Sequence, residues 1–340
     1  GITLNGEFEN DFFFGDFAVH DPNIDMTFSG DIDFSKKIPH YDFDVSIDGA
    51  NLYPLNLLKR DPSTSLCAQL TVDASGDTPD NFEGKIFFDN LTLYEKGRDY
   101  DFGTIDIETF DDGENRSLGI ISDLLSASIY GKYNFEHLSS SFQFLASSVM
   151  PSLFKMENIT TVQSEEVFDF TINIDQPKII TDLIDTNLHI APYSFITGEY
   201  NSIDDEINLR VFSNSIYYGD QGCKVLDIQA EKIHDIVMVE VKANQLEMDD
   251  EVTLDNFALN MVPSQDIINS TLRWENNADN WGNIRFRTNV LSPSNFDILV
   301  KESYFAAAER KWGIHDTPAV TIHSDTIDIQ QLTIQSEGES

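Results

Sequence analysis

Pairs of acidic side chains two residues apart are the first feature of this sequence that could perform chemistry. Asp31 and Asp33 form one such pair, and Asp42 and Asp44 form another. Two carboxylates on one strand face have the donor chemistry of a Ca²⁺ site, or of the acid and base of a glycosidase. Similar pairs recur on many segments, and the sequence has no D-x-[DN]-x-[DN]-G loop. The pattern therefore favours a hydrated acidic sheet face over a metal or catalytic centre.

The other residues that carry chemistry are scattered. The seven histidines include no pair at a strong metal-ligand spacing, and even the nearest two, His315 and His323, fit none. No G-x-S-x-G, H-E-x-x-H, P-loop or G-x-G-x-x-G motif is present. The two cysteines, Cys67 and Cys223, lie in separate strand-like segments, which favours two buried free thiols over a disulfide. We expect no catalytic residue, no metal site, no cofactor and no enzymatic activity.

The segments that would position any site alternate between apolar and polar residues with a period of two. Phe43, Val45 and Ile47 alternate with Asp and Ser, and the segment 168–174 alternates in the same way. This is the pattern of a strand with one buried face and one hydrated face. Such segments recur along most of the chain with short polar turns between them, so we expect an all-β fold with antiparallel neighbours. Alternation alone leaves a sandwich, a barrel and an open meander as alternatives.

Two segments depart from simple alternation. The apolar positions change parity between Phe88 and Leu91, which predicts a β-bulge near Asp89 and Asn90. Between Leu138 and Phe154 the apolar residues are instead spaced by three or four, which predicts an amphipathic helix interrupted by Pro151, with the serines 139–141 as N-cap candidates. We expect this helix to pack over the apolar sheet face as a lid or plug.

Charge and hydropathy exclude several classes of partner. The chain of 340 residues carries 59 acidic and 21 basic residues, a formal net charge of −38. Nucleic acid is therefore not expected as a partner, because binding phosphates requires clustered Lys and Arg. No apolar run approaches the roughly 20 residues of a membrane-spanning helix. Both ends of the sequence are already in strand pattern, so we expect the chain to be a fragment of a longer protein.

Three consecutive motifs resemble the TamB family of Bacteroidetes-type bacteria (translocation and assembly module subunit, AsmA-like superfamily). They are G-x-I-D-F at Gly30–Phe34, Y-D-F-x-x-x-I at Tyr41–Ile47 and A-N-L-x-x-L-N-L at Ala50–Leu57. Further similarities are the D-P-N at residues 21–23, the segments 82–93 and 138–154, and the closing segment 312–332. Each motif alone is short, and the resemblance rests on their order along most of the chain.

The resemblance implies a long antiparallel meander curled into an open U-shaped groove, called a β-taco, with an apolar interior. It also implies a periplasmic protein whose full-length form is anchored in the inner membrane and ends at an Omp85-type outer-membrane barrel similar to TamA. The implied function is non-enzymatic conduction of phospholipid between the two membranes, with acyl chains held on the inner face. The acidic exterior would repel anionic head groups, which would stay in solvent screened by salt.

On this interpretation the chain divides into an N-terminal part of the groove at 1–137, the helix at 138–156 and a C-terminal part at 157–340. The residues expected to line the groove are Ile32, Phe34, Phe43, Val45, Ile47, Ile105, Ile107, Phe168, Phe170, Ile172, Ile174, Leu209 and Val211. The residues expected on the inner side of the lid helix are Phe142, Leu145 and Val149.

Three alternative functions remain open from the sequence. The first is an assembly factor or holdase for outer-membrane proteins, acting by strand addition to an open sheet edge. The second is a compact secreted β-sandwich that binds glycans or acts as an adhesin, although only three tryptophans are present. The third is an enzyme, which would require two carboxylates to converge in a pocket. Whether a second sheet covers the apolar face distinguishes the sandwich from the groove.

Overall fold

The computed structural model describes residues 1–154, 165–248 and 252–337. These residues form 24 β-strands and two α-helices, and the strands belong to one antiparallel sheet that is open and curled rather than closed. The expected all-β fold class, an open curled meander, is therefore confirmed. Neither helix in this part of the chain has the length and apolarity needed to cross a membrane.

The chain divides into two compact units. Unit 1 consists of Gly1–Lys132 with Phe170–Ile184, and unit 2 consists of Tyr133–Asp169 with Asp185–Ser340. The division expected at residues 137 and 156 stays a prediction, and residues 155 and 156 lie outside the described part of the chain.

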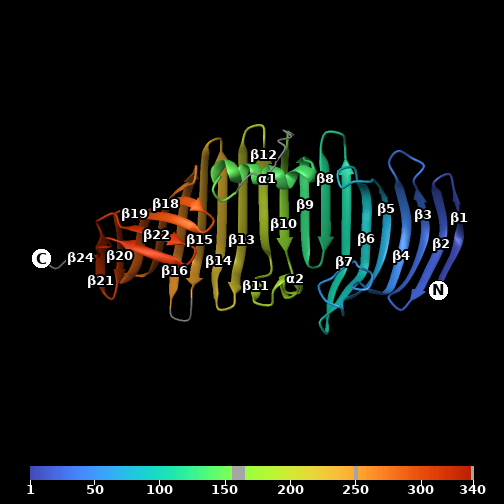
Figure 1. The fold of residues 1–340 in the computed structure, drawn as a ribbon, viewed down its shortest axis with the longest axis horizontal. Coiled ribbons are helices and arrows are strands. Elements are labelled where there is room, and N and C mark those ends of the chain that lie inside the picture. The colour runs from blue at the N-terminus through green and yellow to red at the C-terminus, as the bar shows by residue number, and fades with distance from the viewer. Residues whose placement is uncertain (155–164, 249–251, 338–340) are drawn as a thin grey trace. The chain divides into compact units, whose positions relative to one another are not determined.

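Unit 1 is a meander in which each strand pairs with the next in sequence. In Figure 1 these strands follow one another in chain order from blue to green. Its elements are β1 (Ile2–Glu9), β2 (Phe12–Asp21), β3 (Ile24–Asp33), β4 (His40–Asn51), β5 (Ser65–Ser75), β6 (Glu83–Glu95), β7 (Arg98–Asp111), β8 (Arg116–Ser122), β9 (Leu125–Lys132), the C-terminal part of β10 (Val167–Ile174) and α2 (Pro177–Ile184).

Unit 2 continues the meander from β12 to β19 and then branches, because β18 pairs with both β19 and β20, and β19 pairs with β22. Its elements are α1 (Phe135–Val149), β11 (Leu188–Ile190), β12 (Ser194–Asn201), β13 (Glu206–Tyr218), β14 (Gln221–Ile233), β15 (Ile236–Glu247), β16 (Thr253–Ser264), β17 (Ile267–Asn277), β18 (Asn280–Ser292), β19 (Asn295–Val300), β20 (Ser303–Ala307), β21 (Arg310–Ile314), β22 (Ala319–His323), β23 (Thr326–Gln330) and β24 (Gln335–Glu337).

The register of unit 1 aligns the apolar positions of neighbouring strands. Phe17 of β2 lies opposite Phe28 of β3, Phe28 lies opposite Val45 of β4, and Val45 lies opposite Leu70 of β5. Because successive side chains on a strand point to opposite faces, this row and its neighbours form one continuous apolar face, and the intervening Asp, Ser and Thr side chains form the polar face. The apolar row is buried at its centre, where Phe28 is 5% exposed and Val45 is 9% exposed.

Two facing glycines explain how Phe28 becomes buried on a single sheet. Gly15 lies opposite Gly30 on the apolar face, and Phe43 lies opposite Gly30 on the next strand. The absence of side chains there lets aromatic rings fill the space, as in the packing of an aromatic residue over a glycine in designed sheets. The Phe28 ring centroid accordingly lies 4.8 Å from that of Phe17 and 5.0 Å from that of Phe43.

The expected bulge is confirmed, since the β6–β7 register shifts between Phe88 and Leu91. Asn90 takes a left-handed backbone conformation there, with φ of 53°. Leu91 then pairs with Gly103 of β7, and a second register shift lies between Leu91 and Thr92.

The helix α1 (Phe135–Val149) begins and ends earlier in the chain than the helix predicted between Leu138 and Phe154. Its N-cap is Asn134, whose side chain accepts a hydrogen bond from the His137 backbone N–H at 3.2 Å. The serines expected to cap the helix lie inside it instead, where Ser140 Oγ donates to the His137 carbonyl at 2.8 Å. The helix ends at Val149, because Pro151 cannot continue it and disfavours helical geometry at the residue before it.

The two cysteines are free, as expected, but only one of them is buried. Cys223 is 8% exposed, and burial raises the pKa of its thiol. The expectation that Cys67 is buried is wrong, because this residue lies opposite Thr92 on the polar face of β5 and is exposed.

Candidate functional site

The candidate site is the apolar face of the sheet, because the register gathers most of the predicted groove residues there. In unit 1 each predicted residue on β3, β4 and β7 lies opposite another residue of the apolar face. The pairs are Ile32 with Tyr41, Val45 with Phe28, Ile47 with Met26, Ile105 with Phe88, and Ile107 with Ile86. Phe43 shares this face, since it lies between Tyr41 and Val45 with the same parity.

Most of these side chains are only half-buried. Apart from Val45, every predicted strand residue of unit 1 keeps part of its surface accessible, although its neighbours in the row are apolar. Such partial exposure across adjacent strands makes a large apolar surface, and large apolar surfaces mark sites for ligands or partners.

Phe34 differs from the other predicted residues. It lies just beyond the end of β3 and is 51% exposed, with its ring meeting the edge of Tyr41 at a centroid distance of 6.2 Å. The strand ends at Asp33, whose carboxylate accepts hydrogen bonds from the backbone N–H and the hydroxyl of Ser35 and thereby forms a turn. Phe34 is therefore at the margin of the apolar face.

In the part of β10 that belongs to unit 1, Phe170, Ile172 and Ile174 share one side of the strand. Asn173, which points to the other side, donates a hydrogen bond to Ser126 Oγ at 3.2 Å. Ser126 lies opposite Ile121, an exposed residue of β8 that alternates with the apolar row. The three predicted residues of β10 therefore project from the apolar face, and each is half-buried.

In unit 2 the predicted residues Leu209 and Val211 lie opposite Ala230 and Ile228 on β14. Phe168 belongs to the same face, because its ring packs at 5.4 Å from Tyr200, which lies opposite Ile207.

The helix α1 packs against this face of unit 2 through Phe142. The Phe142 ring centroid lies 6.3 Å from that of Phe168 and 5.9 Å from that of Tyr200. Phe142 nevertheless remains 37% exposed, and the other two residues predicted on the inner side, Leu145 and Val149, are half-buried. The helix therefore covers one end of the apolar face without sealing it (Figure 1).

Hydrogen bonds connect the C-terminal end of α1 to the turn between β16 and β17. The Asp266 carboxylate accepts hydrogen bonds from the Ser152 backbone N–H and the Ser152 hydroxyl, both at 2.8 Å. The Asp266 backbone N–H also donates to the Val149 carbonyl at 3.3 Å. These contacts fix the helix at the end opposite its Asn134 cap.

Charged groups interrupt the apolar face of unit 2 close to α1. Lys232 is 5% exposed and lies opposite Ile207, and its ammonium pairs with the Asp205 carboxylate. Glu166 is 1% exposed, and its Oε1 has no hydrogen-bond partner among the described residues. Burial, followed by the negative charges of Glu166 and Asp205, raises the pKa of the Tyr200 phenol. These groups mark where the apolar face ends.

Sequence reasoning missed the residues that pack most closely in unit 1. Phe28 and Val72 are among its most buried side chains, and neither was selected as a site residue. Their alternation was as clear as that of the chosen segments. The sequence alone does not show the cross-strand pairing that brings their side chains together.

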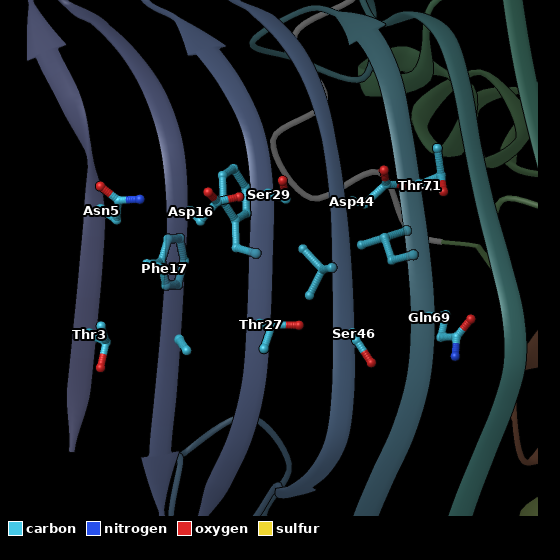
Figure 2. A pocket seen from close by; sticks show the side chains of 14 residues that line it. Thr3, Asn5, Asp16, Phe17, Thr27, Ser29, Asp44, Ser46, Gln69 and Thr71 are labelled. Atoms are coloured by element: carbon cyan, nitrogen blue, oxygen red, sulfur yellow. Dashed lines mark hydrogen bonds between the residues drawn. The ribbon is translucent and has the colours of Figure 1, made fainter.

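The polar face of unit 1 carries a shallow depression of about 470 Å³ over β1 to β5, shown in Figure 2. The labelled side chains come from five neighbouring strands and are mostly hydroxyls, amides and carboxylates. Asp44, a member of a carboxylate pair singled out above, accepts a hydrogen bond from Thr71 Oγ1 at 2.6 Å. In the described residues no three His, Cys, Asp or Glu side chains are grouped so that they could hold a metal ion.

Comparisons with known proteins do not place this chain. No family model, no curated protein and no solved structure matches it. The fold defines an open, curled, single-sheet protein with one apolar and one polar face, and the family stays a proposal.

Proposed function

We propose that the apolar face of the sheet binds the acyl chains of phospholipids and that this chain is a non-enzymatic lipid-conducting segment. The observation that carries the proposal is the register in unit 1, which aligns apolar side chains across neighbouring strands while leaving most of them half-exposed. No second sheet is present in the described residues to cover this face.

The energetics of such a face suit movement of lipid better than tight storage. Each acyl CH₂ that leaves water contributes about 0.8 kcal/mol, so a run of six gives about 5 kcal/mol. This contribution is similar at each point where apolar side chains follow one another, because it does not depend on orientation. An acyl chain can therefore shift along the face from one row to the next at little cost.

The resemblance to the TamB family supplies the cellular setting of the proposal. In it the chain is a periplasmic segment of an inner-membrane-anchored protein that passes phospholipid towards an Omp85-type outer-membrane barrel. The polar face of unit 1, rich in Asp, Ser and Thr, is suited to contact water.

Site-specific crosslinking tests the proposal. A photoactivatable residue placed at position 170, on the apolar face, should crosslink to phospholipid during expression, and the same residue at position 121, on the other face, should not. Ile172→Asp should abolish crosslinking from position 170, because an ionised carboxylate beside the acyl chain opposes its burial. Mass spectrometry of the purified protein under native conditions should show bound phospholipid.

The matched control for Ile172→Asp is Ser128→Asp, which adds the same charge on the polar face of unit 1 and should leave crosslinking unchanged. Equal crosslinking from positions 170 and 121, or full crosslinking in the Ile172→Asp variant, would show that this face does not hold lipid.

The glycan-binding or adhesin alternative depended on a compact sandwich. The described strands form one open sheet, so that alternative loses its structural basis and is not proposed.

A further inference from the structure

Three basic side chains stand together on the polar face of unit 2, and we call Arg285, Arg287 and Lys301 the basic cluster. Arg285 and Arg287 are two residues apart on β18 and therefore point to the same face. Lys301 directly follows β19, and its backbone N–H donates to the Arg285 carbonyl at 2.8 Å, which places it beside Arg285. All three side chains are exposed.

Two other cations of unit 2 form ion pairs with carboxylates on a neighbouring strand. Arg210 Nη2 lies 2.9 Å from Asp227 Oδ2, and this pairing lowers the pKa of Asp227. Lys224 Nζ lies 2.7 Å from Glu247 Oε1, and the hydrogen bond raises the pKa of Lys224. Such matching is the expected arrangement in a chain with nearly three acidic residues for each basic one.

The basic cluster lacks this matching. Arg285 donates from Nε and Nη2 to the Glu302 backbone carbonyl, at 3.1 and 3.0 Å, and only at 3.7 Å does it approach the Glu302 carboxylate. Lys301 Nζ donates to the Asn269 amide oxygen at 3.4 Å. The Arg287 guanidinium has no hydrogen bond or ion pair among the described residues, and its cross-strand neighbours are Asn269 and Leu299.

Among the described residues, the surrounding carboxylates form an ion pair with Arg285 but none with Arg287 or Lys301. Glu302 is shared, since it also accepts from the Tyr304 hydroxyl and lies 4.0 Å from His315 Nδ1. Asp297 lies opposite Asn289, one row beyond Arg287, and Glu275 lies opposite Trp281 at the far end of β17. Like charges directly opposite one another destabilise a sheet, and the exposed Arg285–Glu302 ion pair at 3.7 Å offsets this repulsion only weakly.

We propose that the basic cluster binds an oxyanion of the phosphate class. A guanidinium presents a planar fork of donors that fits two oxygens of a phosphate, and a nearby ammonium supplies a further point charge. Arg287 is free to make the bidentate contact, and Lys301 and Arg285 stand on the same face to complete it. The overall charge of −38 repels anions at long range, so binding depends on direct contact with these side chains.

The phosphate has two possible sources: a phospholipid head group at a membrane surface, or a soluble phosphorylated molecule. The cluster lies on the face opposite the apolar rows, so the proposal does not depend on acyl-chain binding. Arg287 alternates with Phe286 and Thr288 of the apolar face, and this parity separates the two sites.

The test compares the intact chain with the variant R285Q/R287Q/K301Q. The matched control K36Q/K37Q/K178Q removes the same charge from exposed lysines of unit 1. The probes are inorganic phosphate and glycerol 3-phosphate, followed by NMR titration, and vesicles of phosphatidylcholine with and without phosphatidylglycerol, followed by sedimentation. We expect the intact chain and the control to bind at least one probe, and the cluster variant to bind it roughly tenfold more weakly or not at all.

The two arms distinguish the sources. Binding of soluble phosphate supports a soluble ligand, and binding only to vesicles that contain phosphatidylglycerol supports a head group. If the intact chain binds neither, or the control loses binding as the cluster variant does, the proposal is overturned. The single variant R287Q guards against misfolding of the triple variant, because the Arg287 side chain supports no other described residue. Undiminished binding by folded R287Q would likewise overturn the assignment.

Discussion

Phe28→Ala tests whether close packing of side chains on the apolar face of unit 1 stabilises the sheet. The Phe28 ring is 5% exposed and touches the rings of Phe13, Phe17 and Phe43, with centroids 5.9, 4.8 and 5.0 Å away. Truncation of a buried Phe to Ala costs roughly 3–5 kcal/mol. A loss of about 3 kcal/mol makes opening of β2 to β4 roughly a hundred times more frequent, because each 1.4 kcal/mol is about tenfold. Hydrogen–deuterium exchange of these strands measures that opening.

The matched control is Phe14→Ala. Phe14 lies in the same region of β2 but faces the other way, opposite Asp31, and is 59% exposed. With less than half of its ring buried, its truncation should cost about 1 kcal/mol, and exchange should accelerate less than about tenfold. Equal acceleration in both variants would refute the reasoning, since it would mean that the two faces of β2 and β3 contribute alike to stability.

Two further predictions concern unit 2. Asp266→Ala removes the carboxylate that accepts two hydrogen bonds from Ser152, so exchange of the last turn of α1 should rise roughly tenfold, and Gln265→Ala should not change it. The second prediction concerns Asp227, whose pKa is lowered below its ordinary value of 3.8 by hydrogen bonds from Arg210. The stabilisation of the folded state by these hydrogen bonds is therefore fully present above the unfolded-state pKa, and it disappears as the pH falls through the folded-state pKa. Arg210→Gln should therefore cost under about 1 kcal/mol at about pH 6, since Arg210 is 45% exposed. The cost should become smaller as the pH falls below the ordinary pKa of 3.8, and an equal cost in urea unfolding throughout would contradict the linkage.

The strand pattern could be predicted well because one face of each strand is apolar. The segment 168–174 was recognised from its alternation and forms most of β10, and the parity change at Asp89 and Asn90 located the bulge. Openness was harder to predict, since alternation fits a sandwich as well as a meander. It was the family resemblance that suggested an open sheet.

The helices show where local pattern fails. The start of α1 depends on Asn134, a single capping residue that apolar spacing does not reveal. The helix α2 could not be predicted from the sequence, because its eight residues are too few for a helical period to be distinguished from a short strand. Tertiary contacts stabilise it, since Pro177 and Thr181 are buried.

The candidate site was predictable only in part. Parity identified Val45 and Ile47 correctly as members of the apolar face, but it also included Phe34, which follows the turn that Asp33 forms at the end of β3. A one-dimensional pattern states which face a residue occupies and not how far the strand continues. It also cannot say which neighbour lies opposite, and this information is what makes Phe28 the centre of an aromatic group.

The basic cluster could not be predicted from the sequence for the same reason. The sequence shows Arg285 and Arg287 on either side of Phe286, which by itself is ordinary strand alternation. Only the sheet register places Lys301 beside Arg285 and gives Arg287 two uncharged neighbours. In a chain with 59 acidic residues, a carboxylate at either neighbouring position would have neutralised the guanidinium. A strand that places Arg285 beside Lys301 and leaves Arg287 without an ion pair among the described residues accepts like-charge repulsion in its folded state, and binding of the proposed anion would reduce that repulsion.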